Sequence, residues 1–170
     1  MFGLFKSAPR PQEPVRYIGE VEIQKPCEDV YALLDFADPR NAKRALGHDV
    51  REIGKGRFQM VMDTLPDLTF VFDVREARPA RRYEFDCIIE PALPNLVRSN
   101  EVYELEPLNE AACRLTLTNT VELRPGLGKR EYRHETAMMA TSTHSALQKL
   151  KLQAEHGAAA TKAVENNALI

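Results

Sequence analysis

The sequence contains no tryptophan, only three cysteines and no excess of charge of either sign. Cys27, Cys87 and Cys113 form no Cys-x-x-Cys pair, and three scattered cysteines cannot build a disulfide framework or a typical zinc site. An odd cysteine count fits a reducing compartment, so we expect a cytoplasmic protein. The formal net charge of −2 over 170 residues argues against broad electrostatic binding to nucleic acid or to anionic lipid.

Long apolar runs are also lacking. No stretch is apolar enough to span a membrane, and residues 1–14 lack the apolar centre of a secretory signal peptide, so we expect no membrane insertion. Pro9, Pro11 and Pro14 each restrict φ and remove a backbone donor, which predicts a flexible Pro-rich segment over 1–14. Residues 157–170 show little apolar periodicity and are predicted to be a flexible tail. One folded domain over 15–156 remains.

Within that domain, alternating apolar and polar residues predict seven strands, and apolar residues at helical spacing predict three helices. A first strand over 16–24 is followed by a helix that begins near Pro26 and by a short helix over 40–46. The other strands follow with short connections, which indicates an antiparallel meander. Turns are expected at Pro66-Asp67 and at Asn109-Glu110, and the strand before the second turn is expected to end at Pro107. The predicted strands and the last helix are 48–54, 57–63, 68–76, 82–90, 96–106, 113–123 and 130–156.

This order of elements resembles a known superfamily, and so does the sequence of residues 21–47, VEIQKPCEDVYALLDFADPRNAKRALG. Both are similar to the START-like, or SRPBCC, superfamily, which includes polyketide cyclase/dehydrase-like and lipid-transport-like proteins. The resemblance implies an α+β helix-grip fold of order β-α-α-β6-α. A seven-stranded curved antiparallel sheet would wrap around the long C-terminal helix. The superfamily uses the cavity between sheet and helix for hydrophobic ligands, which makes 15–156 an expected ligand-binding domain.

Side chains on the inner faces would either line such a cavity or pack an ordinary core, and the sequence alone leaves both open. The apolar candidates are Phe70, Phe72, Tyr83, Phe85, Leu115, Leu117, Met139 and Leu150.

Two polar residues lie in phase with apolar neighbours. Asn119 falls between Leu117 and Val121 on a predicted strand, and Thr143 lies on the apolar stripe of the last helix. A buried amide costs about 1–3 kcal/mol unless it is paired. Asn119 is therefore expected either to bind a ligand or to bond a neighbouring group of the protein.

The predicted strand over 96–106 has two possible inward phases. One turns Arg98, Asn100, Val102 and Glu104 inward, and the other turns Val97, Ser99, Glu101, Tyr103 and Leu105 inward. The second phase is more apolar, which makes Glu101 a candidate for the cavity wall. The alternative for Glu101 is an exposed edge shared with other acidic residues.

No catalytic or metal-binding motif is present. His134 is followed by Glu135, but Met138 stands where a zinc-binding His-Glu-x-x-His helix needs its second histidine. His144 has no placed acid beside it, although its position next to Thr143 would suit the rim of a cavity. The glycine pairs lack the spacing of a phosphate-binding loop or a dinucleotide fold. We therefore expect no metal, no cofactor and no catalytic residue.

The resemblance, together with the missing catalytic motif, favours a protein that binds or transports a hydrophobic small molecule such as a lipid, sterol, quinone or polyketide-like compound. One alternative is a cyclase/dehydrase-like enzyme that uses the same cavity, with Tyr83, Asn119 or His144 orienting a chain or moving protons. Two or more ionisable groups that converge in the cavity would favour the enzyme. A protein–protein adaptor, favoured by an exposed apolar patch, is the third reading. A homodimer is left open.

Overall fold

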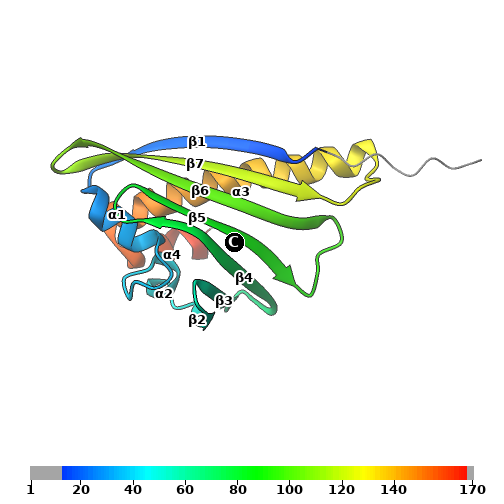
Figure 1. The fold of residues 1–170 in the computed structure, drawn as a ribbon, viewed down its shortest axis with the longest axis horizontal. Coiled ribbons are helices and arrows are strands. Elements are labelled where there is room, and N and C mark those ends of the chain that lie inside the picture. The colour runs from blue at the N-terminus through cyan, green and yellow to red at the C-terminus, as the bar shows by residue number, and fades with distance from the viewer. Residues whose placement is uncertain (1–12, 168–170) are drawn as a thin grey trace, which may run out of the picture.

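The computed structural model describes residues 13–167, and they form one curved antiparallel sheet with helices on its inner face (Figure 1). The predicted α+β architecture of seven strands and a long C-terminal helix is confirmed. The elements are β1 (Val15–Ile23), α1 (Cys27–Leu34), α2 (Ala42–Ala45), β2 (Asp49–Gly54), β3 (Arg57–Met62), β4 (Leu65–Arg78), β5 (Arg82–Glu90), β6 (Leu96–Asn109), β7 (Ala112–Leu123), α3 (Lys129–His156) and α4 (Ala158–Asn167).

The strands follow the order β1-β7-β6-β5-β4-β3-β2, so β2 to β7 form a continuous meander. β1 pairs with β7, the last strand, and this single long-range pairing places the N-terminal strand beside the C-terminal part of the chain. No helix among residues 13–167 is long and apolar enough to cross a membrane.

Helix α3 lies against the inner face of β1 and β7. At Gly19 of β1 the helix comes so close that a Cβ atom built there would lie 2.6 Å from Cδ1 of the buried Leu147. Further along the same strand, the Tyr17 hydroxyl donates to the carbonyl oxygen of Thr136 at 2.8 Å. These contacts anchor α3 at one side of the sheet, and the rest of the inner face is left open towards α1, α2 and α4.

A buried asparagine joins α1 to α2. Asn41 Nδ2 donates to the carbonyl oxygens of Leu33 and Leu34, and its Oδ1 accepts from the backbone N–H groups of Lys43 and Arg44. The Asn41 side chain thus terminates one helix and caps the next, and every polar atom of a side chain that is only 1% exposed has a partner.

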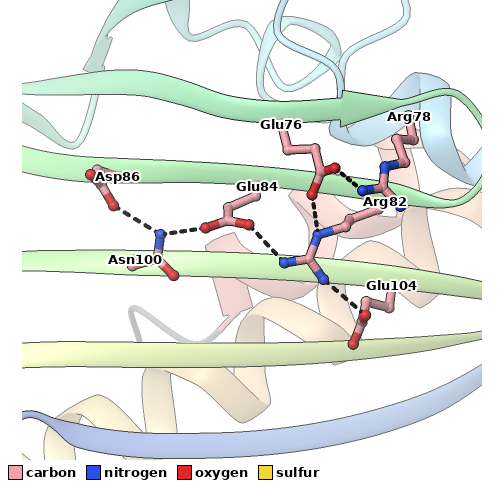
Figure 2. A network of polar contacts seen from close by, with 7 residues as sticks. All are labelled: Glu76, Arg78, Arg82, Glu84, Asp86, Asn100 and Glu104. Atoms are coloured by element: carbon pink, nitrogen blue, oxygen red, sulfur yellow. Dashed lines mark hydrogen bonds and ion pairs between the residues drawn. The ribbon is translucent and has the colours of Figure 1, made fainter.

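The outer face of the sheet is polar. Glu84 and Glu104 alternate along β5 and β6 with residues of the inner face, and both pair with Arg82, at 2.7 and 2.9 Å. Figure 2 shows this network, in which Arg82 also pairs with Glu76 at 2.6 Å and Asn100 donates to Asp86 at 2.8 Å. Partly exposed pairs of this kind each contribute at most about 1 kcal/mol to stability, so the network mainly distinguishes the solvent face from the apolar one.

The turn predicted at Pro66-Asp67 is wrong. Pro66 lies inside β4, because the hairpin closes earlier at Asp63-Thr64. The register between β3 and β4 shifts between Val61, which lies opposite Thr69, and Met62, which lies opposite Leu65, so Pro66 has no strand partner and needs no N–H donor there. The turn predicted at Asn109-Glu110 is found at Glu110-Ala111, but β6 does not end at Pro107 and runs on to Asn109, with a shift of register between Pro107 and Asn109.

The predicted flexible tail is corrected over Ala158–Asn167, where the structure has helix α4. Gly157, at a φ of 86°, ends α3, and the alanines that follow have a high helix propensity. Thr161 of α4 is fully buried, and Lys149 of α3 pairs with Glu165 at 2.8 Å. Contacts with α3 therefore hold a segment whose own apolar pattern is weak. The predicted flexible segment 1–14 falls mostly outside the described residues.

Candidate cavity

A cavity of about 380 Å³ lies between the inner face of the sheet and helices α1, α2, α3 and α4. Its volume is within the usual range for small-molecule sites. Its wall is mostly apolar, formed by Leu33, Leu34, Phe36, Ala42, Leu46, Met60, Met62, Phe70, Phe72, Phe85, Cys87, Ile89, Leu96, Leu117, Met139, Ala146 and Leu150.

Most of the candidates from the sequence lie in this wall. The structure brings together Phe70, Phe72, Phe85, Leu117, Asn119, Met139, Thr143 and Leu150. Leu115 is fully buried in the core and lies outside the wall. His134 and His144 are exposed on α3 and do not line the cavity either, so the expected place of His144 at the rim is wrong.

Tyr83 also lies outside the cavity wall. Its ring packs edge-on against that of Tyr31 of α1, with 5.8 Å between the ring centroids. Its hydroxyl oxygen accepts a hydrogen bond from the Phe36 backbone N–H at 3.1 Å. Burial raises the pKa of this hydroxyl well above 10.0. Tyr83 therefore holds the segment between α1 and α2 in place, and this segment includes Phe36 of the cavity wall.

The polar part of the wall begins with a row of residues across three strands. Glu101 of β6 lies directly opposite Phe85 of β5 on one side and Asn119 of β7 on the other. This register confirms the second inward phase for Ser99, Glu101 and Tyr103, which all line the cavity. Val97 was predicted in the same phase but is exposed, and Leu96 lines the cavity instead, because the register shifts between Leu96 and Arg98. The Tyr103 hydroxyl donates to Oε2 of Glu101 at 2.7 Å.

Asn119 is held by the protein itself. Thr143 has a single hydroxyl proton, which it donates to the Met139 carbonyl oxygen at 2.9 Å. The Thr143 oxygen then accepts from Nδ2 of Asn119 at 3.0 Å, so the two predicted polar residues bond each other. Of the two expectations for Asn119, a bond within the protein is the one found for its Nδ2. Its Oδ1 is buried with no partner among residues 13–167.

Two opposite charges face this cavity without forming an ion pair with each other. Burial raises the pKa of Glu101 above 4.5, and the Tyr103 hydrogen bond and the Lys43 charge act in the other direction. Burial also lowers the pKa of Lys43 below 10.5, again partly opposed by Glu101. Lys43 of α2 is an exposed residue that also lines the cavity.

The α4 end of the cavity carries a second cation and a second anion. Lys149 and Glu165 both line the wall and pair with each other at 2.8 Å. His48 is half-buried nearby, and burial together with the Lys43 charge lowers its pKa below 6.5. No cluster of histidine, cysteine or acidic side chains suited to a metal ion occurs among the described residues.

The sequence matches no protein-family model, and no curated protein is significantly similar to it. Solved structures do resemble the chain. DynU16, a protein from the dynemicin biosynthetic locus, has a TM-score of 0.62 at 19% identity over 86% of this chain, which spans only 49% of DynU16. A conserved protein from Geobacillus kaustophilus has a TM-score of 0.59 at 19% identity, over 84% of this chain and 98% of that protein.

A START superfamily protein from Mycobacterium smegmatis covers 77% of this chain and 98% of its own length, with a TM-score of 0.50 at 9% identity. The fold is START-like. At these identities the resemblance extends to the architecture alone, and the chemistry of the cavity has to come from this chain's own residues.

Three charged residues of the START-like cavity escaped the sequence reasoning. Lys43 lies in a helix of only four residues, too short to show a stripe. Lys149 lies near the end of α3, where a cation is favoured whether or not it lines a cavity, and Glu165 lies in the segment that was predicted to be a flexible tail. For Glu101 the sequence left two alternatives open, because the 96–106 strand had two possible inward phases and Glu101 faces the cavity in only one of them. In the structure Glu101 lies directly opposite Asn119 of β7, and this pairing shows that Glu101 is on the inner face of the sheet.

Proposed function

We propose that this protein binds a hydrophobic small molecule, of lipid, sterol, quinone or polyketide-like type, in the cavity between the sheet and α3. The observation that carries the proposal is a mostly apolar cavity of about 380 Å³ with a few grouped polar side chains. Apolar burial provides about 25 cal/mol per Å² of affinity before ordering costs, and the polar groups orient the ligand. The START-like fold supports the same reading.

Titration with fatty acids, sterols, quinones and aromatic polyketides tests this proposal, together with native mass spectrometry of the purified protein for a co-purified ligand. Ala146 lines the cavity from α3, so Ala146→Trp should fill it and reduce affinity for any ligand found at least tenfold. Ala140 is exposed on the same helix, and Ala140→Trp is the matched control that should bind as the wild type does. Equal binding by both variants would place the ligand elsewhere.

An enzyme of the cyclase/dehydrase kind is the second candidate, and Glu101 and Lys43 favour it. Two ionisable groups do converge in the cavity. The Glu101 carboxylate would take a proton from a carbon next to a ligand carbonyl, and the Lys43 ammonium would stabilise the negative charge that develops on the carbonyl oxygen. Hydrogen–deuterium exchange at that carbon in D₂O, measured by NMR, should then disappear in Glu101→Gln while binding persists. Exchange at the wild-type rate in this variant would exclude Glu101 as the base.

The adaptor reading receives less support. The most exposed large apolar side chains among the described residues are Ile18, Ile53, Met138 and Val164, and they lie on β1, β2, α3 and α4. Scattered single side chains of this kind are normal on a protein surface.

A further inference from the structure

The charged side chains of the cavity that have free hydrogen-bonding groups restrict which ligand it accepts. Glu101 Oε2 is occupied by the Tyr103 hydroxyl at 2.7 Å. Glu101 Oε1 has no hydrogen bond from the described residues, and it is not among their fully buried unpartnered atoms, so it remains reachable from the cavity that Glu101 lines. Lys43 lines the same cavity, and its ammonium group has no hydrogen bond or ion pair with the described residues.

The neighbouring polar side chains cannot take over these roles. Lys149 is already paired with Glu165 at 2.8 Å. Asn119 and Thr143 bond each other at 3.0 Å, and the Thr143 proton is used by the Met139 carbonyl. The charged groups of the wall that are left free are therefore Glu101 Oε1 and the Lys43 ammonium group, and the buried Oδ1 of Asn119, opposite Glu101, is a further unpaired acceptor.

We propose that the bound molecule carries a neutral hydroxyl group that donates to Glu101 Oε1 and accepts from Lys43 Nζ. This inference rests on the proposed binding function and names the ligand class. A hydroxyl is both donor and acceptor, so it satisfies both charged groups without adding a charge of its own. An ether has no proton to donate, so it leaves Glu101 Oε1 unpaired.

Charged head groups fit less well. A carboxylate gains from Lys43 but is repelled by Glu101, and an ammonium group gains from Glu101 but is repelled by Lys43, in a setting where burial strengthens both effects. The opposed charges thus select against an acid and an amine alike, and leave an alcohol or phenol as the favoured class.

Four ligands with comparable apolar chains test this selection by isothermal titration calorimetry at pH 7. They are decan-1-ol, its isomer 1-methoxynonane, decanoate and decylammonium. The wild type should bind decan-1-ol about tenfold to a hundredfold more tightly than 1-methoxynonane, and more tightly than either ion. A wild type that binds all four equally, or that prefers an ion or the ether, overturns the inference. Failure to bind these four and every compound of the panel above contradicts the proposed function itself, whereas a protein that binds a panel compound but not decan-1-ol overturns the inference alone.

Two variants make the test specific. Glu101→Gln removes the repulsion, so decanoate should gain affinity at least tenfold over its wild-type value, while Lys43→Met should give the same gain to decylammonium. Glu104→Gln, on the outer face of the same strand, is the matched control and should leave all four affinities unchanged. If neither cavity variant changes the relative affinities for decanoate and decylammonium, the head group lies elsewhere in the cavity and the inference fails. Circular dichroism of each variant confirms that it is folded.

Discussion

At the scale of the residue, Glu101 is the group whose environment departs most from what its type prefers. It is an acid in a mostly apolar cavity, held by one hydroxyl and facing a lysine that it does not touch. Burial favours its protonated form, and the Tyr103 hydrogen bond and the Lys43 charge favour the ionised one. Because burial is the largest of these effects, the pKa is raised, and the stability of the protein should depend on pH through this residue.

The expected sign follows from proton linkage. The folded state keeps the Glu101 proton at pH values where the unfolded chain has lost it. The stabilisation by this group is therefore complete below pH 4.5 and is lost as the pH rises through the raised pKa. Glu101→Gln has no such loss. The difference in free energy of unfolding between this variant and the wild type should therefore increase in favour of the variant as the pH rises from about 4.5 to the raised pKa. The gain is at most about 1.4 kcal/mol per pH unit.

Urea unfolding of both proteins from pH 4 to 8 measures this difference. Tyr103→Phe removes the hydrogen bond that lowers the pKa of Glu101, so in this variant the loss should extend to higher pH. Parallel pH profiles of the wild type and Glu101→Gln would show that Glu101 ionises in the folded state as it does in the unfolded chain.

At the scale of the element, the position of α3 depends on one close approach to β1. Gly19 leaves room for Leu147, and the register of β1 against β7 places Gly19 opposite Leu117. Since α3 carries Met139, Thr143 and Ala146 into the cavity wall, a displacement at Gly19 would be transmitted to the ligand site.

Gly19→Ala should therefore destabilise the protein by about 1–3 kcal/mol, because its methyl group would overlap Leu147. Leu147→Ala alone should cost about 2–5 kcal/mol by leaving a cavity. In the double variant the alanine at 19 has room. The loss of stability measured for the double variant should therefore be smaller, by at least about 0.5 kcal/mol, than the sum of the losses of the two single variants, as is usual for residues in contact. Chemical denaturation of the four proteins completes the cycle, and strictly additive losses would argue against the overlap.

At the scale of the whole molecule, the cavity is a cost that a bound ligand would offset. Protein interiors are normally close-packed, so a space of about 380 Å³ forfeits contacts that a filled core would make. A ligand that binds only the folded state stabilises it by mass action, by about 2.7 kcal/mol at a hundred times its dissociation constant. The helix-grip arrangement keeps the space open because α3 is anchored at the β1 and β7 side, while α1, α2 and α4 close the other side.

Local patterns in the sequence were sufficient for the elements. Alternation along β5 and β7 and the stripe on α3 are determined by neighbours a few residues apart, and the seven strands and the long helix were predicted from them. The same patterns placed Phe70, Phe85, Asn119 and Thr143 on inner faces, because the face of a strand or helix follows from its period.

Only the tertiary structure decided what depends on distant segments. Tyr83 has the same inward phase as Phe85, yet α1 covers it and removes it from the cavity. Segment 158–167 is helical because it packs on α3, a contact that its own composition does not reveal. Lys43 and Glu101 come from elements more than fifty residues apart, and pairing of β6 with β7 and the placement of α2 bring both into one cavity. The sequence by itself thus determined the fold, whereas the polar chemistry of the cavity arose from long-range packing.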